Sequence, residues 1–181
     1  MPDSTDADLI ERAQAGDVRA VGELYDRYHQ RIFRYVWARV DNQHLAEDLT
    51  GEVFTRMVVG LRRYRLTEIP FQAWLYRIAS NLVADHYREE GRRILVPLYH
   101  AEAITMEGNN PATIVEGKFT AERVKQALSR LDPLQREVVV LRFLIGFPLK
   151  DVALALDKTV AAIKSLQYRG LEALRGALEE E

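Results

Sequence analysis

The last third of the chain concentrates side chains whose chemistry suits contact with a nucleic acid. Residues 158–175 hold one acid, Glu172, and four basic residues: Lys158, Lys164, Arg169 and Arg175. Helical spacing predicts a buried side formed by Ile163, Leu166, Gly170 and Leu174. The opposite side then presents small and basic residues, which leave room for base edges and place cations near phosphates. The pattern predicts a helix that enters a groove of DNA.

The preceding segment supplies the partner that a helix-turn-helix requires. Residues Leu149–Leu156 have helical spacing, with Val152 and Ala153 on the inner side. Asp157 and Lys158 form the predicted turn, and the Thr159 hydroxyl is suited to cap the next helix by accepting a hydrogen bond from its first turn. Since helix-turn-helix patterns are short, an ordinary helical hairpin with a solvated basic face is the other interpretation.

A second group of cations and aromatic rings occurs earlier in the chain. The run Arg62–Arg65 leads into a loop that Pro70 closes, and Phe71 and Trp74 follow. Proteins that bind single-stranded nucleic acid combine cations along the backbone with rings that stack on bases. The segment therefore predicts a contact with a single strand, while packing in the apolar core is the alternative role for Phe71 and Trp74.

Charge is unevenly distributed along a chain whose formal net charge is −2. Residues 1–60 carry seven Arg against eleven acids, whereas residues 61–93 carry seven Arg against four acids. A nearly neutral chain does not suit a protein that coats nucleic acid without specificity. An acidic segment beside a basic one instead predicts two different partners.

The sequence contains no group of side chains that predicts catalysis, a metal site or a cofactor. Its four histidines lack metal-ligand spacing, and without cysteine it forms neither disulfides nor a cysteine-ligated zinc site. No apolar run approaches the roughly 20 residues that span a bilayer. The acidic, polar N-terminus does not resemble a signal peptide. We expect a cytoplasmic binding protein, without membrane insertion, that is not an enzyme.

Apolar spacing predicts helices nearly throughout the chain and no strand. A short first helix is expected to be capped by Asp6 or Asp8 and to end at Gly16, a residue suited to the left-handed conformation. Three longer helices are expected over residues 19–40, 44–64 and 71–90. Asp132 and Pro133 suit the N-cap and the first position of a later helix.

Helical periodicity stops between residues 91 and 117. A structureless stretch of this length is unusual inside one compact domain, so it predicts a tether between domains. The expected fold class is all-α, with two small helical domains joined by a flexible linker and a helix-turn-helix in the second. The expected boundaries are 1–93 for the first domain, 94–117 for the linker and 118–181 for the second domain.

Three segments of the chain, two of which include residues discussed above, follow one another in an order that is typical of a known family. They are AEDLTGEVFTRMV at 46–58, FQAWLYRIASNLVADHYRE at 71–89, and the segment that begins LDPLQREVVVLRF and contains the helix-turn-helix at 131–175. In this order they resemble the bacterial sigma factors of the extracytoplasmic-function (ECF) group in the sigma-70 family. The likeness covers nearly the whole chain and is more specific than a lone helix-turn-helix.

The resemblance implies a transcription initiation factor that directs bacterial RNA polymerase to promoters. The residues that would bind polymerase, on a basic coiled coil of its β′ subunit, are Glu47, Asp48, Glu52, Phe54 and Arg56. Those that would bind and open the −10 element are Arg62, Arg63, Tyr64, Arg65, Phe71, Trp74, Arg77, Asn81 and Arg88. Those that would bind the −35 element are Lys158, Val160, Ala161, Lys164, Ser165, Tyr168 and Arg169. The implied partners are the polymerase core (β′ and β subunits), promoter DNA and an anti-sigma factor.

Two residues depart from the pattern of the family. Gly51 stands where the DLTQEVF motif has Gln, and a glycine inside a helix costs about 1 kcal/mol relative to alanine. It also removes an amide that could bond to polymerase. Asp157 stands where the turn commonly has Gly, and Asp is one of the few other residues that tolerates the left-handed conformation.

Two other functions are compatible with parts of the sequence. A helix-turn-helix regulator would use residues 1–90 for dimerisation or signal input and would bind DNA without polymerase. A helical adaptor would only sequester a partner. The basic, aromatic segment Arg62–Asn81 argues against the regulator, and the cations of 158–175 argue against the adaptor.

Overall fold

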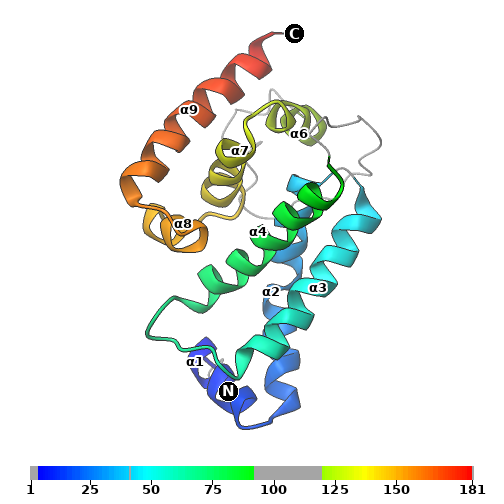
Figure 1. Ribbon diagram of the computed structural model, residues 1–181, viewed down its shortest axis with the longest axis vertical. Coiled ribbons are helices and arrows are strands. Elements are labelled where there is room, and N and C mark those ends of the chain that lie inside the picture. The colour runs from blue at the N-terminus through cyan, green and yellow to red at the C-terminus, as the bar shows by residue number, and fades with distance from the viewer. Residues whose placement is uncertain (1–3, 41, 92–119, 181) are drawn as a thin grey trace.

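Residues 4–40 and 42–91 form a helical unit in this computed structural model (Figure 1), and their buried apolar side chains belong to a core that continues into the helices after residue 120. The structure describes residues 4–40, 42–91 and 120–180, and the predicted linker, 94–117, lies outside them. The helices of this unit are α1 (Asp6–Gln14), α2 (Val18–Arg39), α3 (Gln43–Leu61) and α4 (Phe71–Glu89). The fully buried side chains at its centre include Leu24, Tyr28, Ile32, Met57 and Leu75.

Side-chain caps fix where the first two helices begin. Thr5 caps α1: its hydroxyl accepts a hydrogen bond from the Asp8 amide at 3.2 Å, and the Asp8 carboxylate accepts one from the Thr5 amide at 3.0 Å. The expected cap, Asp6 or Asp8, was therefore wrong, because Asp8 is the reciprocal member of a capping box. Gly16 adopts the expected left-handed conformation (φ 96°), and the Asp17 carboxylate then caps α2.

The second unit contains α6 (Ala121–Ser129), α7 (Pro133–Val139), the π-helix η1 (Val140–Leu144), α8 (Leu149–Leu156) and α9 (Val160–Glu179). The Asp132 carboxylate accepts from the Leu134 amide at 3.1 Å, and Pro133 occupies the first turn, as predicted. The π-helix was not expected, since apolar spacing does not distinguish a single π turn from an α turn. No strand occurs in the described ranges, nor is any helix there long and apolar enough to span a membrane.

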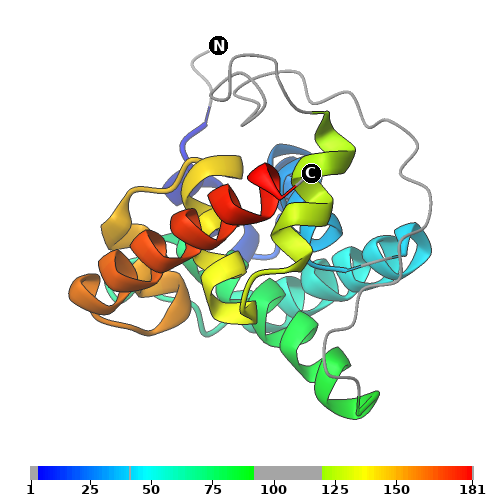
Figure 2. The same ribbon diagram turned by 90° about the horizontal axis from the view of Figure 1, so that it is seen from above.

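Helix α9 packs closely across α7, as Figure 2 shows. Gly170 lies at the crossing, and a Cβ atom there would lie 2.8 Å from Val139 Cγ2 and 3.2 Å from the Gln135 carbonyl oxygen. The absence of a side chain at Gly170 thus allows the two helices to approach. This contact sets the orientation of α9 and of its exposed face.

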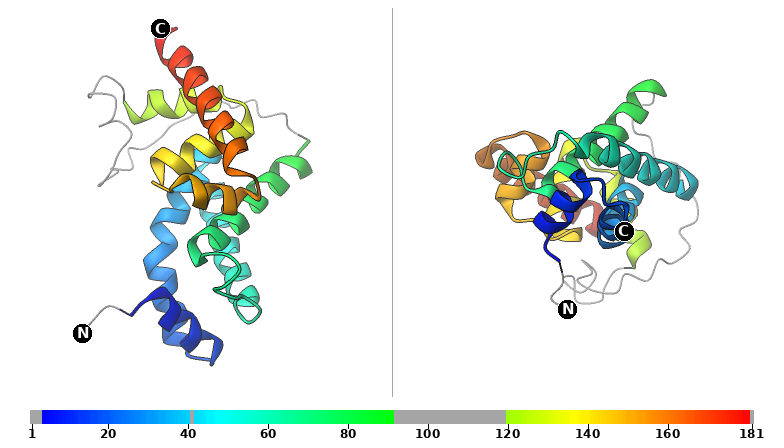
Figure 3. Two further views of the ribbon diagram at one scale, coloured as in Figure 1. Left: turned by 90° about the vertical axis from the view of Figure 1, so that its left-hand side faces the viewer. Right: turned by 90° about the horizontal axis from the view of Figure 1, so that it is seen from below.

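The two units pack against each other through α4 and α8 and through α2 and α7 (Figure 3). The rings of Tyr76 on α4 and Phe147, just before α8, meet edge to face with centroids 4.7 Å apart. The Lys125 ammonium on α6 lies 3.6 Å from the centroid of the Trp37 ring on α2. The Arg77 guanidinium donates to the carbonyl of Leu154 near the end of α8.

A polar cluster is buried where α2 meets α7. Glu137 Oε1 lies 2.9 Å from Arg39 Nη1, and both side chains are less than a tenth exposed (8% and 6%). The Tyr35 hydroxyl also donates to Glu137, and burial, together with the charge of Glu137, raises the pKa of Tyr35, so that the phenol stays protonated. The neighbouring Arg136 donates to the carbonyl of Ala38. Two adjacent residues of α7 thus hold the end of α2.

We predict that Gly170→Ala destabilises the second unit. The added methyl overlaps Val139 and the backbone at Gln135, and overpacking of this kind costs about 1–3 kcal/mol. Gly176→Ala is the matched control on the same helix, because no atom lies within 4 Å of its added Cβ. Thermal unfolding followed by circular dichroism should show a lower Tm for Gly170→Ala and an unchanged or higher Tm for Gly176→Ala. Equal Tm values for the two variants would contradict the close crossing.

Candidate nucleic-acid interface

The first three turns of α9 present a continuous exposed face. All seven residues predicted to contact the −35 element are exposed, with Tyr168 at 69%: Lys158, Val160, Ala161, Lys164, Ser165, Tyr168 and Arg169. On the other side of the helix, Ile163, Leu166 and Gly170 are buried. The helix therefore keeps one side in the apolar core and leaves the other free for a groove of DNA.

The turn before α9 has the geometry that the sequence predicted. Asp157 adopts φ 53° and ψ 50°, the left-handed conformation that ends α8. The Lys158 amide donates to the Ala153 carbonyl at 2.9 Å, and the Thr159 hydroxyl accepts from the Ala162 amide at 3.1 Å. These bonds satisfy backbone groups at the end of α8 and the start of α9. The turn is thereby held in one shape and orients α9.

The basic loop between α3 and α4 is held in place by the buried Tyr64 ring and by hydrogen bonds to its backbone. Arg62, Arg63 and Arg65 are exposed, whereas Tyr64 is buried and donates from its hydroxyl to the Ile69 carbonyl at 2.6 Å. Burial raises the pKa of Tyr64 to about 12, so its phenol remains a donor. The Gln14 amide donates to the Tyr64 carbonyl at 2.9 Å. The loop thus presents three cations on a fixed backbone.

The aromatic residues next to this loop pack mainly inside the protein. Phe71 is 3% exposed, and its ring meets that of Tyr28 edge to face with centroids 5.4 Å apart. Trp74 is half-buried, 4.7 Å from Tyr64 between ring centroids and against Gly60, where a Cβ would lie 3.0 Å from Trp74 Cζ2. Both rings thus lie in the core and support the loop, and the predicted contact of Tyr64 and Phe71 with bases stays a prediction. Trp74 keeps part of its surface exposed.

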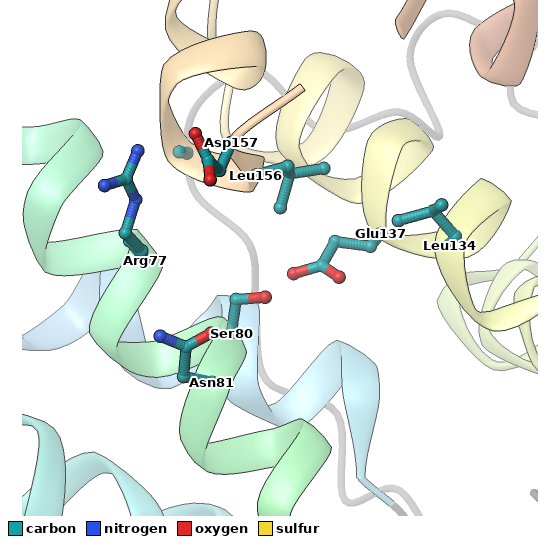
Figure 4. A pocket seen from close by; sticks show the side chains of 8 residues that line it. Arg77, Ser80, Asn81, Leu134, Glu137, Leu156 and Asp157 are labelled. Atoms are coloured by element: carbon teal, nitrogen blue, oxygen red, sulfur yellow. The ribbon is translucent and has the colours of Figure 1, made fainter. Parts of the chain in front are cut away.

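The remaining residues of the −10 set lie along α4 in different environments. Asn81 and Arg88 are exposed, and Arg88 pairs with Asp85. Arg77 is half-buried, since its guanidinium is held by the Leu154 carbonyl of the second unit. Figure 4 shows Arg77 and Asn81 beside a cavity of about 230 Å³. The structure thus leaves Asn81 accessible and turns Arg77 toward α8.

Helix α3 presents a polar face with an apolar end. Exposed members of the predicted polymerase-binding set are Glu47, Asp48, Glu52 and Arg56, and Arg56 Nε lies 3.0 Å from Glu52 Oε1. Phe54 is 5% exposed and meets the Tyr25 ring edge to face with centroids 4.7 Å apart, and its predicted contact with polymerase stays a prediction. Val59 is 74% exposed one turn beyond Arg56.

Sequence reasoning missed Val59 as a surface residue. The signal was present, because Glu52, Arg56 and Val59 follow one another at helical spacings of four and three and so share a face. The inward residues of α3, among them Val53 and Met57, follow a different stripe. An exposed apolar side chain at the end of a polar face extends the surface that a partner can contact.

The part of the chain that the structure describes contains no cluster of His, Cys, Asp or Glu suited to a metal ion. Its buried charges serve structural contacts between helices, as Arg39 and Glu137 do. What the arrangement offers is binding: a free helix face in the second unit, and a basic loop with an acidic helix face in the first.

Comparison with known proteins places both units in one family. Sigma-70 region 2 matches residues 24–93, and sigma-70 region 4 matches residues 121–174. The ECF RNA polymerase sigma factor BldN of Streptomyces coelicolor is 37% identical over 96% of this chain and 66% of its own length. The chain thus spans just under two thirds of that relative. SigD of Mycobacterium tuberculosis, another ECF sigma factor, is 30% identical over 92% of this chain and 81% of its own length.

The chain belongs to the ECF sigma factors of the sigma-70 family. A solved structure of the sigma factor RpoE with the anti-sigma factor NepR from Bartonella quintana shares the fold, with a TM-score of 0.74, 20% identity and coverage of 91% of this chain and 99% of that one. Family membership makes the chain an RNA polymerase sigma factor, as the sequence predicted. Two sigma regions in order do not favour the stand-alone regulator.

We predict different effects for two substitutions at Gly51 of α3. Gly51 is exposed, and no atom lies within 4 Å of an added Cβ, so Gly51→Ala should raise the free energy of unfolding by about 1 kcal/mol through helix propensity. Gly51→Gln adds the amide that the family motif carries, and should also tighten binding to core polymerase. Thermal unfolding and equilibrium binding to labelled core polymerase measure the two effects.

Gly22→Ala is the control for these variants, because Gly22 is also exposed and helical with open space around an added Cβ. It should change stability without changing polymerase affinity. Equal polymerase affinities for Gly51→Ala and Gly51→Gln would show that the lost amide has no role at this position.

Proposed function

We propose that this sigma factor directs promoter-specific initiation by reading the −10 element with residues 1–93 and the −35 element with residues 118–181. Residues 94–117 would link the two domains. The observation that carries the proposal is the exposed face of α9, which a left-handed turn at Asp157 holds in a helix-turn-helix.

Recognition of the −35 element would use the start of α9 in the major groove. Val160 and Ala161 suit contact with thymine methyl groups, and Lys164 and Ser165 suit base edges or phosphates. Lys158 and Arg169 flank this face, and we assign them to the backbone. All of these residues are exposed, so the surface needs no rearrangement to accept duplex DNA.

Recognition of the −10 element would use the basic loop and the accessible part of α4. Arg62, Arg63 and Arg65 would follow the backbone of the separated strand. Extraction of a base costs a few kcal/mol, which stacking and edge hydrogen bonds must offset. The Trp74 ring lies beside the loop and keeps part of its surface exposed, so it could stack on a base. The exposed Asn81 has an amide that could form hydrogen bonds with a base edge.

Core polymerase would bind the exposed face of α3. Asp48 and Glu52 are suited to the basic coiled coil of the β′ subunit that the family resemblance implies, and opposite charge speeds and orients such an encounter. Val59, exposed at the end of the same face, adds an apolar contact. The β subunit and an anti-sigma factor are the other protein partners that we propose, and the cytoplasm is where all of these partners occur together.

Transcription in vitro with purified bacterial core polymerase tests this function on a library of upstream DNA fragments. We predict discrete start sites that depend on the added chain and share two spaced elements. Lys164→Ala should lower initiation at these sites about tenfold, since a lost contact in the recognition helix costs about 1–3 kcal/mol.

Arg175→Ala is the matched control, because it removes one cation from the same helix about 16 Å further along its axis. Arg175 is exposed and pairs with Glu179 at 3.0 Å, away from the start of α9. Its loss should change initiation less than twofold. A DNA shift by the chain alone, with no transcripts from any fragment, would instead support a stand-alone regulator.

A further inference from the structure

One cation of the second domain bonds to segments on both sides of the turn of the helix-turn-helix. Arg142 lies in η1, and its Nε donates to Gln167 Oε1 of α9 at 2.8 Å. Its Nη1 donates to the carbonyl of Phe147, just before α8, at 2.5 Å. Arg142 and Gln167 are both half-buried. A single guanidinium thus connects the start of α8 with α9.

The backbone after η1 brings the Phe147 carbonyl within reach of Arg142. The Phe147 amide donates to the Leu141 carbonyl at 2.9 Å, which closes a wide turn at the end of η1. Gly146 lies inside this turn and adopts φ 84°, a conformation that glycine adopts readily. A π turn is rare and is frequent at functional sites. Here the π turn and the glycine together place Arg142 against both helices of the helix-turn-helix.

The apolar contacts of α9 fix its rotation about its own axis less firmly than a hydrogen bond does. The buried side of its first three turns consists of Ile163, Leu166 and Gly170. Apolar contacts are non-directional, and Gly170 presents only backbone to α7 at the crossing. Gln167 is at the edge of this buried side, next to the exposed face with Lys164. A hydrogen bond at this edge opposes rotation, because it requires a narrow range of distance and angle.

Small rotations of α9 matter for a surface that reads base edges. A side-chain end about 6 Å from the axis moves by about 1 Å when the helix turns by about 10°. Hydrogen bonds to bases tolerate a smaller displacement, about 0.5 Å. Lys164 is three residues before Gln167 and therefore its neighbour on the helix surface. The position of Lys164 thus follows that of Gln167.

We propose that Arg142 is a positioning residue for promoter selectivity: its bond to Gln167 sets the rotation at which α9 reads the −35 element. This proposal rests on the function proposed above for α9. Without the bond the helix turns, and contacts with matching bases weaken. Attraction to phosphates carries no sequence information and changes little. The chain then loses discrimination between promoters and keeps its capacity to bind DNA.

Gln167→Leu tests the proposal, because it removes the acceptor without a change of charge. The measurement is transcription by the full chain with core polymerase, on a promoter from the fragment library and on templates with one base pair of its −35 element replaced. Selectivity is the ratio of initiation on the parent template to that on a replaced one, and we expect about tenfold for the parent chain. Gln167→Leu should lower this ratio about fivefold, through weaker initiation on the parent template.

Gln167→Glu is the conservative variant, because it keeps an acceptor for the Arg142 guanidinium at the same place. Its selectivity should stay within about twofold of that of the parent chain, whereas its negative charge should lower initiation on every template by one common factor. Equal losses of selectivity in Gln167→Leu and Gln167→Glu would overturn the proposal. A purely structural role would change Tm and lower initiation on all templates alike, without a change in the ratio.

Arg142→Met removes the donor and shows whether the two side chains act together. In the Arg142→Met background, Gln167→Leu should cause no further loss of selectivity, since the interaction is already broken. Losses that multiply in the double variant would show that the two residues act independently, against the proposal. Thermal unfolding checks that each variant folds. If Arg142→Met does not fold, the two Gln167 variants decide.

Salt dependence separates positioning from a direct contact with DNA. The measurement is equilibrium binding of the chain with core polymerase to the promoter duplex over a range of salt concentrations. We expect the slope of log affinity against log salt to be the same for Arg142→Met and the parent chain. A slope reduced by about one, with selectivity unchanged, would show that Arg142 binds a phosphate and would overturn the proposal.

The outcomes also distinguish this inference from the proposed function. If the parent chain gives start sites that depend on the −35 element, and Gln167→Leu keeps full selectivity, positioning by Arg142 is wrong and the sigma function stands. If the parent chain gives no start sites, or base replacements in the −35 element have no effect on it, the function proposed for α9 fails and this inference fails with it.

Discussion

The buried pair between Glu137 and Arg39 is the contact on which the arrangement of the two domains depends. Arg39 Nη1 lies 2.9 Å from Glu137 Oε1, and the Tyr35 hydroxyl donates to the same carboxylate oxygen. Since both donors come from α2, they hold the Glu137 side chain in one position against that helix. Buried pairs of this kind add little net stability, because each charge gives up its hydration. They fix orientation, and here they hold α7 at the end of α2 and α8 along α4.

This arrangement gives the two surfaces that we propose read the promoter different exposure. The start of α9 is free, since its opposite side packs on α7 with Gly170 at the crossing. The surface on α4 is shared, because Arg77 is bound to the end of α8. Two modest DNA contacts suffice to select a promoter when both domains belong to one chain that is bound to polymerase. Tethering raises the effective concentration of each domain at the DNA. A nearly neutral protein can then choose promoters without binding DNA indiscriminately.

Features set by neighbouring residues were predictable from the sequence, and those set by distant residues were not. The turn at Asp157 and the cap at Thr159 depend on local backbone chemistry, and both were predicted. The burial of Phe71 depends on packing from α2 and the loop, which apolar type alone does not distinguish from a surface role. The partners of Glu137 and Arg77 lie 98 and 77 residues away along the chain. No local pattern identifies such pairs.

Promoter opening tests the central claim most directly, because a sigma factor must act with polymerase to separate the strands. The measurement is permanganate reactivity of thymines in promoter DNA, with the chain alone, with core polymerase alone and with both. The account predicts reactive thymines at the −10 element only when both proteins are present. Thymines that stay unreactive with both proteins, on DNA that the chain alone protects, would contradict it.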